Sequence, residues 1–112
     1  MRNPIVVERD EKTRVMHYYW CSGYDDLHGV VVHKTDGGSC WAFTGSLECP
    51  TYSPSVLTTW TFGPERTEQR CHTFVREGIV EFLGDCTHAL AGQKVPLPPV
   101  PDWLVKESDD GI

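Results

Sequence analysis

The chain has 112 residues, and ten Lys and Arg residues against sixteen Asp and Glu residues give it a formal net charge of −6. This length suits one domain, so we predict a single domain over residues 1–112 with its core at about 14–104. The acidic balance argues against a protein that neutralises phosphates, which makes nucleic acid an unexpected partner. No apolar stretch approaches the roughly 20 residues of a membrane-spanning helix, and the first residues do not form an export signal. We therefore expect a soluble protein without a membrane partner.

Runs rich in aromatic and β-branched residues predict short strands in the first half of the chain. Gly23 and the acidic residues that follow it indicate a turn between the first two of these strands. Pro50 and Pro54 remove backbone donors and bias their predecessors toward extended geometry, so we expect an ordered connection over residues 50–55. The strands predicted before this connection span residues 14–20, 29–33 and 40–44.

A tight hairpin is the clearest signal in the second half of the chain. Glu77 and Gly78 separate two strand-like runs at residues 71–76 and 79–83. Glycine suits this turn because a two-residue hairpin connection requires positive φ. The segments before the hairpin are a predicted strand at residues 56–62 and a predicted exposed, charged loop at residues 63–70.

The end of the chain predicts one short helix and an extended segment. Asp85 can cap a helix over residues 85–91, and Gly92 is placed to end that helix in left-handed geometry. The proline-rich residues 96–101 must be extended, and the acidic tail at residues 105–112 is expected to fray. We therefore predict a mainly β fold of the small α+β kind, a compact antiparallel sheet with one short helix.

Two separated Cys and His pairs indicate a metal site that staples this small fold. Cys21 and His28 bracket the first turn, and Cys71 and His72 begin the hairpin. Thiolate and imidazole are the ligands that zinc prefers, and without an export signal metal ligands or thiols are favoured over disulfides. Neighbouring strand residues point to opposite faces, so Cys71 and His72 reach one ion only if the strand starts at them or bulges. We predict a zinc ion bound by these four residues.

A third group, Asp85, Cys86 and His88, leaves the ligand set open. If only Cys71 of its pair binds the metal, then Cys86, His88 or a water molecule supplies the fourth donor. Asp85 and His88 admit three interpretations: a helix cap with a first-turn histidine, which we favour, a partner that orients a ligand, or acid–base residues beside a catalytic zinc. No strained nucleophile elbow surrounds the hydroxyls of residues 52–55, and turn formation explains them better.

Four separated motifs also resemble those of a known family. They are Trp20 and Cys21 followed by His28, Gly45 with residues 50–57 (PTYSPSVL), residues 71–79 (CHTFVREGI) and residues 85–93 (DCTHALAGQ). In this order the motifs resemble the DUF6527 family of small, uncharacterised proteins of tailed bacteriophages and prophages. The resemblance extends from residue 17 to about residue 103.

The resemblance implies a phage origin, action in the host cytoplasm and a zinc site at Cys21, His28, Cys71 and His72. Members are often labelled ammonia monooxygenase, but a membrane-embedded copper enzyme needs spans and ligand clusters that this sequence lacks. Many relatives carry a second cysteine a few residues after the first, whereas this chain has Tyr24 in that loop.

The favoured function at this level is nonenzymatic. The sequence contains no complete catalytic constellation, and a small, acidic protein of this kind fits a phage accessory protein that binds a host or phage protein, for example to inhibit a host defence during host takeover. The alternative is a small mononuclear zinc hydrolase with an open coordination position, in which Asp85, His88 or a loop glutamate transfers protons. An open position in a pocket would favour the hydrolase, and a closed site would favour binding alone.

Overall fold

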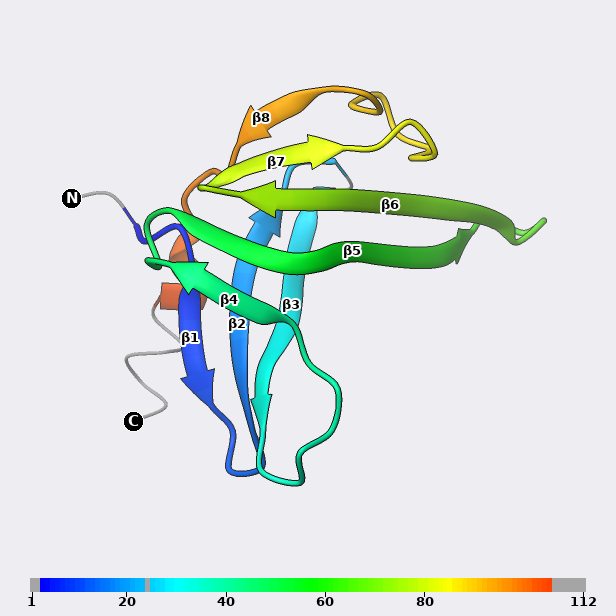
Figure 1. Ribbon diagram of the computed structural model, residues 1–112. Helices are drawn as coiled ribbons and strands as arrows, with labels where there is room; N and C mark the ends of the chain where they lie inside the picture. The colour runs from blue at the N-terminus through cyan, green and yellow to red at the C-terminus, as the bar shows by residue number, and fades with distance from the viewer. Residues whose placement is uncertain (1–2, 24, 106–112) are drawn as a thin grey trace.

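The computed structural model describes residues 3–23 and 25–105, which form two antiparallel sheets (Figure 1). The three-stranded sheet has the order β1-β2-β3, and the five-stranded sheet has the order β4-β5-β6-β7-β8. Within each sheet, strands that are neighbours in the chain are therefore hydrogen-bonded neighbours. The strands are β1 (Val7–Asp10), β2 (Arg14–Cys21), β3 (Asp26–Lys34), β4 (Ala42–Gly45), β5 (Pro50–Phe62), β6 (Thr67–Arg76), β7 (Ile79–Phe82) and β8 (Lys94–Pro96).

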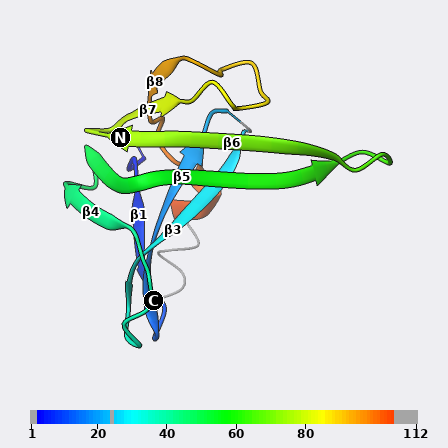
Figure 2. The ribbon, with the colours of Figure 1, turned by 45° about the vertical axis from the view of Figure 1, so that its right-hand side comes forward.

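The strands of the two sheets cross, and the hairpin of β5 and β6 reaches out beyond the rest of the molecule (Figures 1 and 2). The main core lies where the sheets face each other. Its largest fully buried side chains are Tyr52 and Phe82 of the five-stranded sheet, and His17 of the three-stranded sheet contacts Tyr52, with Nδ1 2.7 Å from the phenol oxygen. Alternation along β6 buries Cys71, Thr73 and Val75 and leaves the residues between them accessible on the opposite face.

The predicted tight hairpin is confirmed. β6 ends at Arg76, β7 begins at Ile79, and the two residues between them have φ values of 52° and 75°. Two neighbouring predictions were wrong. The charged loop at residues 63–70 is strand from residue 67 onward, because residues 67–70 pair with the end of β5. The connection at residues 50–55 is the first part of β5, where one proline starts the strand and the other lies in a register shift, positions that tolerate proline.

The mainly β class with antiparallel pairing and one short helix is confirmed, but the helix lies elsewhere. Residues 102–105 are helical, whereas residues 84–92 contain only turns and bends. The predicted helix at residues 85–91 does not form. The amide and hydroxyl of Thr87 bond to the backbone of Arg70 instead, and the sulfur of Cys86 accepts from the amide of His72, so the segment is tied to β6. Among the described residues, no helix combines the length and the apolar character that a membrane span requires.

The proline-rich segment follows the body of the protein. Leu97, Val100 and Leu104 are buried, and the amide of Val100 donates to the carbonyl of Pro4 at 2.9 Å. The extended course predicted for residues 96–101 agrees with this path, because these residues contain no helix and only the end of β8. The predicted fraying covers the tail at residues 105–112. Val105 belongs to the short helix, and residues 106–112 lie outside the described residues.

Candidate active site and metal-binding group

Three polar side chains meet on the exposed face of the five-stranded sheet. Ser55 lies on β5, His72 on β6 and Asp85 in the turn after β7. Ser55 Oγ is 2.9 Å from His72 Nε2, and His72 Nδ1 is 3.1 Å from Asp85 Oδ2. His72 takes this direction because its neighbours Cys71 and Thr73 point into the core. One imidazole therefore bridges a hydroxyl and a carboxylate, which is the geometry of a Ser–His–Asp triad.

An irregular stretch of β5 carries the serine. Tyr52 pairs with Val75 and Val56 pairs with Thr73, so three residues of β5 lie opposite a single residue of β6. Such bulges occur next to active sites, where they redirect a side chain. Ser55 is the last residue of this bulge, and its hydroxyl lies within hydrogen-bond distance of the imidazole.

The hydrogen-bond directions of the triad follow from the chemistry of its members. An ionised carboxylate only accepts hydrogen bonds, so in the neutral imidazole Nδ1 carries the proton and donates to Asp85, while Nε2 accepts from the Ser55 hydroxyl. The side chains of His72 and Asp85 are 26% and 41% exposed, which leaves the triad open to a substrate. Arg70 adds a cationic neighbour, with Nη1 3.8 Å from Asp85 Oδ2.

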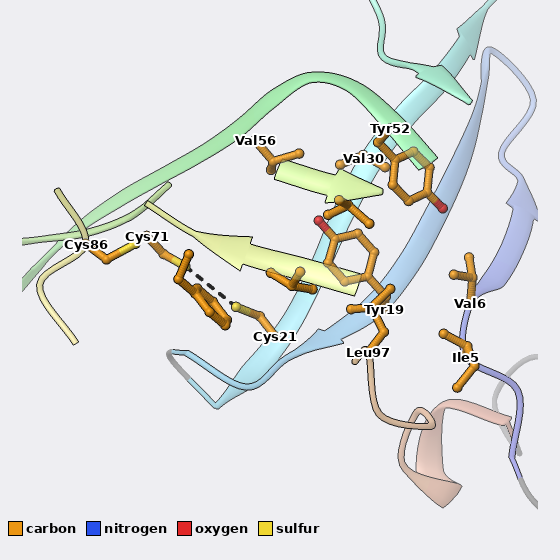
Figure 3. Close-up of a cluster of buried hydrophobic side chains, with 13 residues drawn as sticks. Ile5, Val6, Tyr19, Cys21, Val30, Tyr52, Val56, Cys71, Cys86 and Leu97 are labelled. Atoms are coloured by element: carbon orange, nitrogen blue, oxygen red, sulfur yellow. Dashed lines mark hydrogen bonds between the residues drawn. The ribbon is translucent and has the colours of Figure 1, made fainter. Parts of the chain in front are cut away.

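A second cluster lies on the core side of the same strand. Cys71, Cys86 and His88 place their ligand atoms within 4.8 Å of one another, and such a group could hold a metal ion. Cys71 Sγ lies 3.3 Å from His88 Nε2 and 3.7 Å from the sulfur of Cys21, which reaches it from β2 of the other sheet (Figure 3). The prediction is therefore confirmed to the extent that the protein contains a group that could hold a metal ion.

Hydrogen bonding and burial shift the pKa values of two members of this cluster. The hydrogen bond with Cys21 and, next, burial raise the pKa of the Cys71 thiol, so a cation is needed to favour the thiolate. Burial lowers the pKa of His88, which favours the neutral imidazole that binds metals. Gly23 makes this packing possible: a Cβ atom at this position would lie 2.5 Å from His88 Nε2.

The turn after β7 is bonded directly to the backbone of β6. The amides of Leu83 and Thr87 donate to the carbonyls of His72 and Arg70, each at 2.9 Å. The sulfur of Cys86 accepts from the His72 amide at 3.2 Å and lies 3.3 Å from the His72 carbonyl oxygen. These bonds hold the segment that carries the triad acid against the strand that carries the imidazole.

The four predicted zinc ligands fall into separate environments. Cys21 and Cys71 lie together, while His72 points to the opposite face of β6, with its ring nitrogens close to oxygen atoms. His28 Nδ1 lies 3.2 Å from the hydroxyl of Thr58, and burial lowers the pKa of His28 to about 4. His28 does line one small internal cavity together with Cys21 and Cys71.

The three residues named as alternatives are divided between the two clusters. Asp85 contacts His72 in the triad, and Cys86 and His88 belong to the metal-binding group. The interpretation of Asp85 as a helix cap was wrong because no helix begins there. Ser55 was passed over as a turn-forming hydroxyl. The only signal for it was the chain order Ser, His, Asp, which is too general to single out one serine.

Comparison with known proteins places the chain in a family. A family model described as "Bacterial ubiquitination-like system serine protease (BubE)" matches residues 1–83. The match includes Ser55 and His72 and ends shortly before Asp85. Because it covers most of the chain, the chain belongs to this family. Comparisons with curated proteins and with solved structures found no match.

The family match corrects three predictions. The assignment to the DUF6527 phage family was wrong, and so was the description as a bacteriophage protein of host takeover, because the matching model is that of a bacterial protease family. The predicted function as an accessory protein that binds a host or phage protein was wrong for the same reason. The motifs on which the resemblance rested contain Ser55, His72 and Asp85. The alternative zinc hydrolase was nearer in class, but its open metal position is not confirmed.

Proposed function

We propose that the chain is a serine protease of a bacterial ubiquitination-like system. Ser55 acts as the nucleophile, His72 as the general base, and Asp85 orients the imidazole. The observation that carries the proposal is the position of His72 between Ser55 Oγ, at 2.9 Å, and Asp85 Oδ2, at 3.1 Å. The description of the family supports the same reaction class.

The geometry suits acyl transfer through a covalent intermediate. As Ser55 Oγ attacks the carbonyl carbon of the scissile bond, its proton moves to His72 Nε2, and the carbonyl oxygen takes the negative charge. Collapse of the tetrahedral intermediate breaks the bond to the leaving group, which receives the proton from His72. Water then attacks the acyl-serine by the same route, releases the acid and restores the Ser55 hydroxyl. Asp85 stays ionised throughout and holds the proton on Nδ1.

A fluorophosphonate tests the nucleophile directly, because it phosphonylates an activated serine with loss of fluoride. We expect the protein to gain one probe molecule at Ser55, located by peptide mass spectrometry, and Ser55→Ala to gain none. Ser53→Ala is the matched control, since Ser53 is an exposed serine of the same bulge. For hydrolysis of p-nitrophenyl acetate, Ser55→Ala should lower kcat/KM by about 10³-fold or more. Labelling of Ser55→Ala at the unmodified rate would overturn the assignment.

We further infer that the metal-binding group, together with Cys21, holds zinc. Three thiolates and one imidazole from Cys21, Cys71, Cys86 and His88 would make a closed tetrahedral site of the structural type. The 3.7 Å between the sulfurs of Cys21 and Cys71 is close to the edge of such a tetrahedron, which is about 3.8 Å for Zn–S bonds of about 2.3 Å. In this arrangement His72 is free for the triad, and the nucleophile is a serine rather than a metal-bound water.

Metal analysis of purified variants separates this ligand set from the one that sequence spacing suggested. Cys86→Ser should lose zinc, whereas His72→Ala and His28→Gln should keep one zinc ion per chain. Cys49→Ser serves as the control because Cys49 is exposed and unbridged. Loss of zinc from His72→Ala, with full zinc in Cys86→Ser, would contradict the assignment.

A further inference from the structure

The triad and the metal-binding group are joined through adjacent residues of the chain. Cys71 immediately precedes His72 in β6, and Asp85 immediately precedes Cys86 in the turn after β7. A single peptide unit therefore connects a ligand to a triad residue at each of two places. Because successive strand residues point to opposite faces, the ligand cluster lies directly behind the imidazole.

We propose that the metal ion, by holding Cys71 and Cys86 together, positions His72 against Asp85 and so sets the reactivity of Ser55. This inference rests on the proposed serine protease function. It assigns to the ion a positioning role in catalysis, in addition to stapling the two sheets through Cys21.

The contacts of Cys86 support such a role. Its sulfur accepts a hydrogen bond from the His72 amide at 3.2 Å, and its thiol lies 3.3 Å from the His72 carbonyl oxygen. A metal-bound thiolate has no proton to donate, so the contact with the carbonyl oxygen would weaken while the bond from the amide would strengthen. Partners of this kind around metal ligands fix the orientation of the groups that they contact. The ion would thus fix the peptide that carries the catalytic imidazole.

The location of Asp85 makes positioning necessary. It lies in a turn rather than in a strand, and its side chain is 41% exposed. A catalytic group on such a segment is held less precisely than one on a strand. Its next neighbour in the chain is a metal ligand, so the ion would anchor the turn within one residue of the carboxylate.

Metal exchange tests the proposal on a folded protein. In a Cys40→Ser, Cys49→Ser variant, which lacks the two exposed thiols, the bound metal is removed with a chelator under reducing conditions and replaced by zinc or by the larger cadmium ion. We expect the zinc-free protein to show on the order of tenfold slower fluorophosphonate labelling, with full recovery after zinc is returned. With p-nitrophenyl acetate, kcat should fall while KM stays nearly constant.

The cadmium protein keeps the test decisive if the metal-free chain does not fold. Cadmium should preserve the fold, measured by circular dichroism and thermal unfolding, yet its longer bonds should shift Cys71 and Cys86 and slow labelling several-fold. The downfield proton resonance of the His72 Nδ1–H bonded to Asp85 should move between the zinc and cadmium forms. Equal labelling rates and an unchanged proton resonance in two folded forms that differ in metal would overturn the proposal.

The resonance also separates failure of the positioning role from failure of the proposed function. If Ser55 does not react with the probe but the His72 proton resonance still depends on the metal, the serine protease assignment fails and the link between ion and imidazole stands. If Ser55 reacts equally in every metal form and the resonance does not move, the protease assignment stands and the positioning role is wrong.

Discussion

Each face of β6 has a histidine at a polar cluster, and the two clusters support different chemistry. On the exposed face, the ring nitrogens of His72 lie beside the oxygen atoms of Ser55 and Asp85. On the core side, His88 Nε2 lies beside the sulfur of Cys71. Oxygen partners make an imidazole a relay for protons, and sulfur partners make it one of several ligands for a soft cation. The difference is set by the direction of side chains along one strand.

The largest expected effect is on kcat, and it comes from a substitution on the exposed face of β6 that leaves the metal-binding group unchanged. Asp85→Asn keeps the size of the side chain but removes the charge that holds the imidazole proton on Nδ1, so kcat for p-nitrophenyl acetate should fall about 10³-fold to 10⁴-fold. Zinc content should remain at one ion per chain, because Asp85 is not among the proposed ligands. Asp26→Asn, on β3, is the control and should match the unmodified protein. Loss of zinc from Asp85→Asn would contradict this assignment, because it would mean that Asp85 takes part in metal binding.

A third histidine extends the comparison to an apolar setting. Burial lowers the pKa of His28 from 6.5 to about 4, and its Nδ1 lies 3.2 Å from the hydroxyl of Thr58. The unfolded chain therefore takes up the proton first as the pH falls. Stability from this residue is complete above pH 6.5 and is lost progressively toward pH 4 and below, by up to about 3 kcal/mol.

Chemical denaturation of the protein and of His28→Asn between pH 4 and 7 measures this effect. The asparagine amide can replace Nδ1 at Thr58 but does not titrate, so the difference between the two free energies of unfolding should change with pH, with the native protein losing stability faster. The thiol ligands are common to both proteins and cancel in the difference. A difference that is constant over this range would mean that His28 is not buried in its neutral form.

A change at Gly23 acts directly on the core-side cluster. In Gly23→Ala the new methyl carbon would lie 2.5 Å from His88 Nε2 and 2.7 Å from Phe82 Cε1. We expect displacement of the imidazole, a loss of about 2 kcal/mol in the free energy of unfolding and weaker zinc binding. Gly84→Ala is the control, because no atom lies within 4 Å of its added carbon. Competition with a zinc-binding dye measures the affinity, and equal affinities in both variants would remove His88 from the ligand set.

The sequence predicted the fold class and the β6–β7 hairpin because both depend on local signals. Alternating apolar residues and the Glu77-Gly78 turn act over a few residues. Local signals also led to the prediction that Cys71 and His72 bind one metal ion, which required the strand to start at them or to bulge, because a regular strand directs their side chains to opposite faces. β6 begins at Thr67, so the pair lies inside a regular strand and its side chains diverge.

The triad escaped sequence analysis because it depends on a bulge and on a turn. The residues around Ser55 do not predict that β5 bulges there or that the Ser55 hydroxyl contacts His72. The turn at residues 84–92 looks helical from its cap and its terminal glycine, but hydrogen bonds to β6 outweigh that local preference. Contacts between separate elements therefore bring Ser55, His72 and Asp85 together, and no single sequence motif predicts those contacts.

The smallest expected effect concerns the surface that a substrate meets. Leu57 is 54% exposed and pairs directly with His72 across β5 and β6, so an apolar acyl group approaching Ser55 should contact it. Leu57→Asn should raise KM for p-nitrophenyl butyrate about fivefold, which corresponds to about 1 kcal/mol of lost contact, and should leave kcat and stability almost unchanged. Ile79→Asn changes another exposed apolar residue, at 40% exposure on β7, and should not alter KM. An equal rise in both variants would indicate a general loss of surface hydrophobicity, and no rise in either would place the acyl group on another side of the imidazole.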